Sequence, residues 1–204
     1  MGFTLLKELR VLLELIRLFF NDTKKVSVAT PVMLIPGFMF SDIYLVPTMY
    51  MLRKKGFNAY GWGLGLNRGY TEEKKRRLIK KIRCMEEVVI VGWSMGGVYT
   101  RQIAYELPEK VKFGLALGSP FQLEGVFFET AYRVASGREL SELNDLLQKQ
   151  KEYKIPVIQI YTRKDGVIPW ESCISPSYIH KEVESSHMGL PFHKVVLETL
   201  KPSP

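Results

Sequence analysis

Ser94 lies at a predicted turn that suits a nucleophilic side chain. In the segment VVIVGWSMGG, an apolar run passes directly into a Gly-Trp-Ser-Met-Gly turn and then into a helical pattern. A serine on such a sharp turn has strained backbone angles, and the small residues Gly92 and Gly96 avoid collisions around it. A serine hydroxyl is a weak nucleophile at neutral pH, so it needs a general base and a group that orients the base. The turn therefore predicts a serine that attacks a carbonyl carbon.

The base and its partner are predicted downstream, in the chain order serine, aspartate, histidine. Asp165 follows the apolar run VIQIYTR, and His187 follows the last apolar run, in ESSHMG. Both lie beyond the carboxyl ends of predicted strands, where sites of this kind assemble. The competing bases, His180 and His193, fall inside a predicted strand and the last predicted helix. The alternative acid is Glu171, and Asp165 has the alternative interpretation of a turn aspartate before glycine.

Amide N–H groups are needed where negative charge develops on the attacked oxygen. The residue after the nucleophile, Met95, supplies one donor of this oxyanion hole. The run VMLI ends at Pro36-Gly37, which makes the amide of Phe38 the expected second donor. Since Pro-Gly is also common at ordinary strand ends, a plain turn is the other interpretation.

Alternating strands and helices must position these residues. Runs rich in β-branched residues predict strands at 32–35, 57–61, 88–91, 113–117, 157–161 and 178–183. Between them, helices are predicted at 44–54, 71–85, 95–107 and 192–200. Such alternation predicts an α/β fold with a mostly parallel sheet of about six strands and helices on both faces. A chain of 204 residues suits one core, so residues 26–204 are predicted to form a single domain.

Residues 121–151 make one connection longer than a crossover requires. The two interpretations are an extra pair of packing helices and a small cap over an apolar pocket. A short cap favours short-to-medium acyl chains. Aromatic residues expected near the carboxyl edge of the sheet are the candidates for the pocket wall: Trp62, Trp93, Phe121, Phe127, Phe128 and Trp170.

Residues 1–25 are predicted to form an amphipathic helix. Leu5, Leu9, Leu12 and Ile16 recur at helical spacing, and charged residues interrupt the apolar run, which argues against a signal peptide or a membrane span. The apolar stripe has three interpretations: packing on the domain, a bilayer-surface anchor and a dimer contact. We expect a cytoplasmic protein, with peripheral contact at a membrane surface as the alternative.

The composition narrows the classes of partner. A formal net charge of +8 favours anionic surfaces such as acidic lipid or an acidic carrier protein. Neither zinc-finger spacing nor an alternating basic and aromatic pattern is present, so nucleic acid is not an expected partner. Two cysteines without a CxxC pair fit a reducing compartment. The glycines of YGWGLGLNRG do not fit a dinucleotide-binding motif, and the basic run KKRRLIKKIR is typical of a solvated helix face.

The stretches VMLIPGF, AYGWGLGLNRG, VVIVGWSMGGVYTRQIA, LGSPF, YTRKDGVIPW and SHMGL resemble the α/β-hydrolase superfamily, in particular its small lipase-like and esterase-like members. The resemblance covers about residues 30–200. It implies the same nucleophile elbow, catalytic triad and oxyanion hole at Ser94, Asp165, His187, Phe38 and Met95. Two departures are Pro36, where many members have histidine, and leading antiparallel strands that are absent or shortened.

These patterns together predict a serine hydrolase that cleaves small-molecule or lipid carboxylic esters through an acyl-serine intermediate, with no metal or organic cofactor. The same triad would serve a thioesterase, a carrier-protein ester hydrolase or an acyltransferase. A catalytically inactive binding protein with this fold is the non-enzyme alternative.

Overall fold

The computed structural model describes residues 31–124, 126–148 and 154–200, so the predicted helix at residues 1–25 lies outside the described part. The strands are all parallel and form one sheet in the order β2-β1-β3-β4-β5-β6. Their bounds are β1 Pro31–Ile35, β2 Asn58–Gly61, β3 Val88–Trp93, β4 Val111–Leu117, β5 Val157–Tyr161 and β6 Ile179–Glu182.

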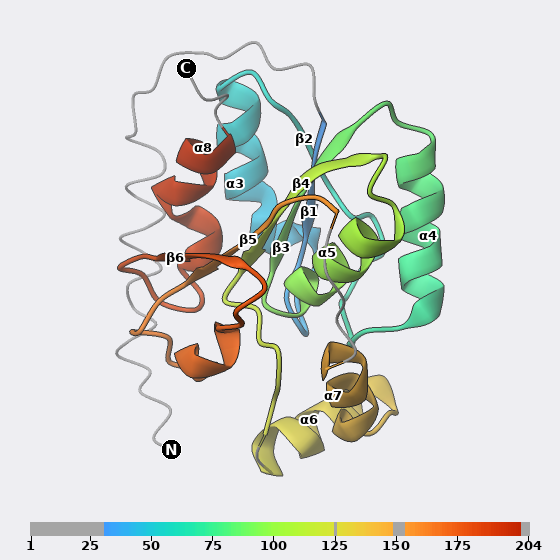
Figure 1. Cartoon of the computed structure of the whole chain (residues 1–204), viewed down its shortest axis with the longest axis vertical. Helices are drawn as coiled ribbons and strands as arrows, with labels where there is room; N and C mark the ends of the chain where they lie inside the picture. Colours follow the sequence, from blue (N-terminus) through green and yellow to red (C-terminus); the bar gives the residue numbers. More distant parts are fainter. Residues whose placement is uncertain (1–30, 125, 149–153, 201–204) are drawn as a thin grey trace.

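Helices cover both faces of this sheet, which Figure 1 shows nearly edge-on. Their bounds are α3 Asp42–Lys54, α4 Glu72–Arg83, α5 Met95–Glu106, α6 Val126–Ser136, α7 Leu140–Gln148 and α8 Lys194–Leu200, with short 3₁₀ turns η1 Trp170–Cys173 and η2 Leu190–Phe192. α3 and α8 pack on one face, whereas α5 and α4 cover the other. The expected α/β fold is confirmed, and the expected strands agree with the observed ones to within about two residues.

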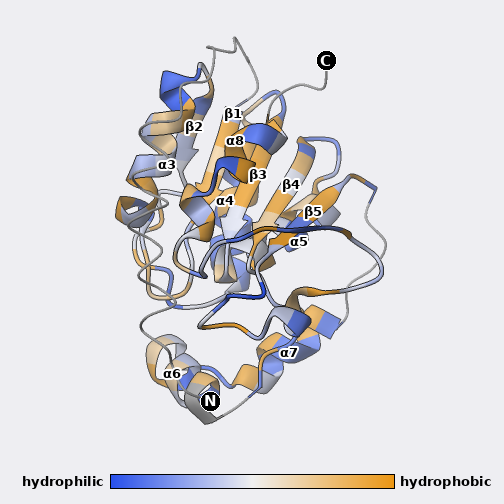
Figure 2. Ribbon diagram, turned by 90° about the vertical axis from the view of Figure 1, so that its left-hand side faces the viewer, coloured by the Kyte–Doolittle hydropathy of each residue, from blue (hydrophilic) through white to orange (hydrophobic). Residues whose placement is uncertain are grey.

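Strand side chains alternate between the two faces, as the period of a strand requires. In β1, Met33 and Ile35 join the core beneath α4 and α5, while Val32 and Leu34 join the core beneath α3 and α8. Figure 2 shows the central strands as a hydrophobic layer between helices whose outer faces are more polar. Burial on both faces explains why these strands read as near-continuous apolar runs.

Helix α4 contains the basic run singled out in the sequence. Thr71 caps it by accepting a hydrogen bond from the amide of Lys74 at 3.1 Å, and acidic residues occupy the first turn. Leu78, Ile79 and Ile82 are buried against the sheet side, so most of its lysines and arginines face outward. The basic run is therefore a solvated helix face. Across the described residues, no helix is long and apolar enough to cross a bilayer.

The last predicted helix is interrupted. The turn η2 ends at Phe192, the next residue, His193, is extended with a ψ of 140°, and α8 begins at Lys194. His193 therefore precedes α8 instead of lying within the helix, which corrects that expectation. Pro191, inside η2, lacks an amide donor and is consistent with a separate short turn.

The strand order places a crevice beside Ser94. The chain after β1 goes to α3 on one face of the sheet, while the chain after the neighbouring β3 goes to α5 on the other. Ligands of open α/β sheets bind at such a switch point, outside the carboxyl ends of the strands. Helices α6 and α7, between β4 and β5, lie beyond this same end of the sheet (Figure 1).

Candidate active site

Ser94 lies on the sharp turn between β3 and α5. Its backbone angles, φ 52° and ψ −119°, fall in a region that residues other than glycine rarely occupy. A Cβ at Gly92 would overlap the carbonyl of Gly96, and a Cβ at Gly96 would overlap the carbonyl of Ile35. The amide of Ser94 donates to the carbonyl of Leu117 on β4 at 2.7 Å. Close packing from both neighbouring strands thus holds the strained turn.

The loop that follows β1, residues 36–40, lies against this turn; we call it the oxyanion loop. A Cβ built on Gly37 would lie 3.2 Å from the Cβ of Ser94 and 2.9 Å from the ring of Trp93. Met39 has φ 62°, a left-handed conformation that is uncommon outside glycine. Within the described part of the chain, the amides of Phe38 and Met95 donate to no protein acceptor.

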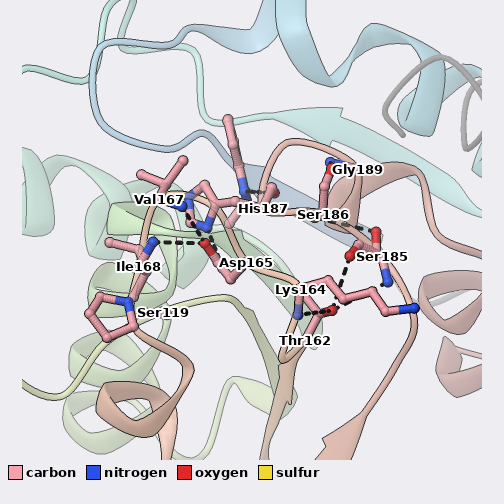
Figure 3. A network of polar contacts seen from close by, with 12 residues as sticks. Ser119, Thr162, Lys164, Asp165, Val167, Ile168, Ser185, Ser186, His187 and Gly189 are labelled. Atoms are coloured by element: carbon pink, nitrogen blue, oxygen red, sulfur yellow. Dashed lines mark hydrogen bonds and ion pairs between the residues drawn. The ribbon is translucent and has the colours of Figure 1, made fainter. Parts of the chain in front are cut away.

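His187 and Asp165 form a buried pair. Nδ1 of His187 lies 2.7 Å from Oδ2 of Asp165, and the two side chains are only 3% and 2% exposed. The other carboxylate oxygen, Oδ1, accepts from the amides of Val167 and Ile168 at 2.8 and 2.7 Å. Figure 3 shows these contacts converging on Asp165. A carboxylate fixed in this way orients the imidazole and favours the tautomer that carries a proton on Nδ1.

The loop between β6 and η2, residues 183–189, contains His187, and we call it the histidine loop. Hydrogen bonds from several elements hold it in place. The indole N–H of Trp93 donates to the carbonyl of His187 at 2.9 Å, and the Tyr44 hydroxyl donates to the carbonyl of Met188 at 2.8 Å. At the base of the loop, Thr162 donates through its hydroxyl to the carbonyl of Ser185 at 3.0 Å (Figure 3). These contacts fix the loop to β3, α3 and the end of β5.

An apolar cavity of about 390 Å³ opens beside these groups. Ser94, Met95 and His187 line it together with Phe38 of the oxyanion loop. The rest of its wall is almost entirely apolar and includes residues of α6 and α7: Trp93, Val98, Leu123, Phe128, Ala131, Tyr132, Leu140, Val167 and Ile168. The insertion between β4 and β5 therefore supplies part of the cavity wall.

Three of the aromatic residues expected in the pocket do not line this cavity. Trp62 is fully buried in the core, where its ring packs on Tyr99 and its N–H donates to Gly65. Phe121 instead packs against the ring of Tyr178, and Trp170 stacks on Tyr161 near the far edge of the sheet. Sequence position alone did not show which way these side chains point.

Trp93 and Phe128, also expected in the pocket, do line the cavity. The side chain of Phe127 lies outside the described part of the structure.

The competing titratable residues lie elsewhere. His180 is on the edge strand β6, where its Nε2 accepts from the amide of Ser175, and His193 accepts from Val195 through Nδ1. Glu171 is exposed on η1. Among the described residues, no group of three His, Cys, Asp or Glu side chains is placed to hold a metal ion.

Cys173 lies close enough to Asp165 to respond to its charge. Burial raises the pKa of this thiol to about 12, and the negative charge of Asp165 adds to the increase. The thiol therefore stays protonated at neutral pH.

Sequence reasoning missed Gly118 in LGSPF. Its φ is 54°, and a Cβ there would lie 3.2 Å from Nδ1 of His187 and 3.4 Å from Oδ2 of Asp165. The neighbouring Ser119 accepts a hydrogen bond at 2.9 Å from the fully buried Arg101 of α5. A glycine directly after a buried strand was the signal available for Gly118, whereas nothing in the pattern linked Arg101 to this turn.

The parallel sheet, the turn at Ser94 and the helices on both faces define the α/β-hydrolase fold. Solved structures with this fold are similar to the chain over most of its length. One comes from a description of LipS and LipT, two metagenome-derived lipolytic enzymes. It has a TM-score of 0.64 at 15% identity, and the similarity covers 87% of this chain and 94% of that one. The expected resemblance is thereby confirmed for the fold.

Two further structures show the range of proteins with this architecture. The monoacylglycerol lipase of Paleococcus ferrophilus has a TM-score of 0.62 at 16% identity, covering 88% of this chain and 98% of that one. A thioesterase domain from the curacin biosynthetic pathway has a TM-score of 0.58 at 11% identity, covering 86% and 92%. No protein-family model and no curated protein sequence matches the chain.

Proposed function

We propose that the protein is a serine hydrolase that cleaves carboxylic esters, with Ser94 as nucleophile, His187 as general base and Asp165 as the residue that orients the base. The observation that carries the proposal is the buried 2.7 Å contact between His187 and Asp165, at a cavity that Ser94 also lines. The names of similar structures, which include lipolytic enzymes, esterases and a thioesterase, agree with acyl transfer to water.

The reaction follows from these roles. The hydroxyl oxygen of Ser94 attacks the ester carbonyl while Nε2 of His187 takes its proton. The amides of Phe38 and Met95 stabilise the resulting oxyanion, since neither N–H group has an acceptor among the residues that the structure describes. Collapse breaks the C–O bond, and the imidazolium protonates the departing alcohol. Water, deprotonated by His187, then attacks the acyl-serine, and the acid leaves as Ser94 regains its proton.

The cavity favours an apolar acyl group of limited length. Its volume of about 390 Å³ corresponds to roughly a dozen water-sized groups. Each methylene that enters it gains about 0.8 kcal/mol, roughly fourfold in affinity, until the cavity is full. We therefore expect kcat/KM for acyl esters of two to sixteen carbons to rise and then fall, with the maximum at a short-to-medium chain. A flat profile, or a steady rise to the longest chain, would contradict this pocket.

The nucleophile is tested by labelling with a fluorophosphonate probe. We expect the native protein to be labelled and Ser94→Ala to lose both labelling and ester hydrolysis while its circular dichroism is unchanged. The exposed Ser177 provides a matched control, because Ser177→Ala removes a hydroxyl far from the elbow in sequence. Labelling that persists in Ser94→Ala would refute the nucleophile, and an unlabelled, inactive native protein would favour a binding protein with this fold.

The same triad would act on thioesters, a chemistry named for one of the similar structures. Matched oxygen esters and thioesters with one acyl chain separate these substrates, because they differ only in the leaving group. For each compound, kcat/KM is divided by the rate constant of spontaneous hydrolysis. We expect this ratio to be higher for the oxygen ester than for the thioester. The reverse ratio would assign a thioesterase, and transfer to an added alcohol in preference to water would assign an acyltransferase.

A further inference from the structure

The glycine-rich segment at residues 61–69, here called the glycine loop, has no role in the mechanism so far. It connects β2 to α4 and does not match a dinucleotide-binding pattern. Its one asparagine, Asn67, is completely buried although its side chain is polar. A buried amide is costly unless its donors and acceptor are satisfied. The partners of Asn67 therefore show what the loop holds in place.

Asn67 bonds to both ends of the oxyanion loop. Its backbone carbonyl accepts from the amide of Met39 at 2.7 Å, and its backbone amide donates to the carbonyl of Phe40 at 2.8 Å. Its side-chain Nδ2 donates to the carbonyl of Pro36 at 2.7 Å. The side-chain Oδ1 accepts from the amide of Gly69 at 3.2 Å, within its own loop. One residue thus joins the first, fourth and fifth positions of the oxyanion loop.

These bonds fix the part of the oxyanion loop that contains Phe38. The amide of Phe40 donates to the carbonyl of Gly37 at 3.1 Å, which closes a turn around Phe38 and Met39. Met39 adopts its left-handed conformation within that turn, at a cost of about 1 to 3 kcal/mol. With the carbonyls of Pro36 and Gly37 both engaged, the amide of Phe38 is held in one orientation.

The glycine loop is itself firmly anchored, so it can serve as a support. The carboxylate of Asp42 accepts from the amides of Trp62 and Gly63 at 3.0 and 2.9 Å. At the other end of the loop, the hydroxyl of Tyr99 donates to the carbonyl of Gly69 at 2.9 Å. Tyr99 belongs to α5, the helix that begins after Ser94, so the support and the nucleophile share one rigid element.

We propose that Asn67 is a positioning residue: its buried amide holds the oxyanion loop so that the N–H of Phe38 is preorganised toward the oxyanion. The inference rests on the proposed function, because it assigns the purpose of an amide in that reaction. Asn67 touches no reacting atom in this mechanism and acts through Phe38. A group displaced by about 1 Å in such a site can lower turnover about a hundredfold.

The test compares Asn67→Ala with Tyr99→Phe. The first removes the side-chain bonds to Pro36 and Gly69. The second removes the bonds of the Tyr99 hydroxyl to the carbonyl of Gly69 and from the amide of Thr71, and leaves Asn67 unchanged. We expect Asn67→Ala to lower kcat for an ester substrate about 10- to 100-fold with less than a threefold change in KM, since the oxyanion forms only in the transition state. Tyr99→Phe should keep kcat within about threefold of the native value, because the carboxylate of Asp42 still anchors the glycine loop and Asn67 keeps its bond to Pro36.

A second measurement does not depend on activity. Amide hydrogen exchange should become at least about tenfold faster at Met39 and Phe40 in Asn67→Ala, but not in Tyr99→Phe, because only the first variant loosens the oxyanion loop. Asn67→Asp keeps the acceptor for Gly69 and removes the amide donor, so its exchange and kcat should follow those of Asn67→Ala.

Equal losses of kcat in Asn67→Ala and Tyr99→Phe would overturn the inference, because the effect would then be general destabilisation of the glycine loop. Unchanged exchange at Met39 and Phe40 in Asn67→Ala would overturn it as well. A native protein that hydrolyses neither esters nor thioesters would contradict the proposed function instead. In that case, the exchange rates still decide whether Asn67 holds this loop.

Discussion

Gly118→Ala should damage the site and the fold together, because the glycine lies directly beneath the histidine and aspartate pair. Its φ of 54° costs a residue with a Cβ about 1 to 2 kcal/mol. The new methyl group would also lie 2.7 Å from Cδ1 of Leu190 and 3.2 Å from Nδ1 of His187. Overpacking of this kind costs about 1 to 3 kcal/mol. We therefore expect a loss of about 2 to 5 kcal/mol in the free energy of unfolding.

Gly137→Ala is the matched control for that variant. Gly137 has φ 70°, and a Cβ there would meet nothing within 4 Å, so the substitution isolates the backbone cost of about 1 to 2 kcal/mol. Urea unfolding measures both variants, and kcat/KM for a short acyl ester should fall about a hundredfold in Gly118→Ala alone. The reasoning is refuted if the two variants lose equal stability and Gly118→Ala keeps native kcat/KM.

Two further predictions test the site from other directions. Asp165→Asn should lower turnover about a thousandfold or more while the protein stays folded, because an amide no longer orients His187 correctly; near-native turnover would transfer the role to Glu171 or another acid. In a thiol titration with Ellman's reagent at pH 8, the exposed Cys84 should react in the native protein, whereas Cys173 should react only after unfolding. The thiolate is the reactive form, and at pH 8 a pKa near 12 leaves almost none of it on Cys173, so rapid labelling of both thiols would contradict the buried, protonated state.

The sheet could be predicted well because its signal is local. The apolar runs of the central strands β1, β3, β4 and β5 can hardly be accommodated except as buried parallel strands, whereas the edge strands β2 and β6 are shorter and partly exposed. The chain order of Ser94, Asp165 and His187 then placed all three at one edge of the sheet. The structure brings Asp165 and His187 into contact there, beside a cavity that Ser94 lines.

The cavity wall could not be predicted in the same way, because the direction of a loop side chain depends on distant partners. Trp62 follows β2 at the expected edge, yet the carboxylate of Asp42 binds its amide and its ring turns into the core. Trp170 stacks on the ring of Tyr161 and packs against the guanidinium of Arg163. The Cζ atom of Arg163 lies 4.4 Å from the centroid of the Trp170 ring. The role of Asn67 was hidden for the same reason, since its partners lie about thirty residues earlier in the chain.

Changes in helices α6 and α7 offer a way to a new substrate specificity, because these helices form a separate insertion. They lie between β4 and β5, which are neighbours in the sheet and pair through Gly114 and Val157. Ser94, His187 and the oxyanion loop all lie outside this insertion. Apart from Tyr132, whose ring packs on Phe38, mutations in this insertion can therefore reshape the cavity without altering strand register. Evolution, or a directed library limited to residues 126–148, could change the preferred substrate while leaving the chemistry intact.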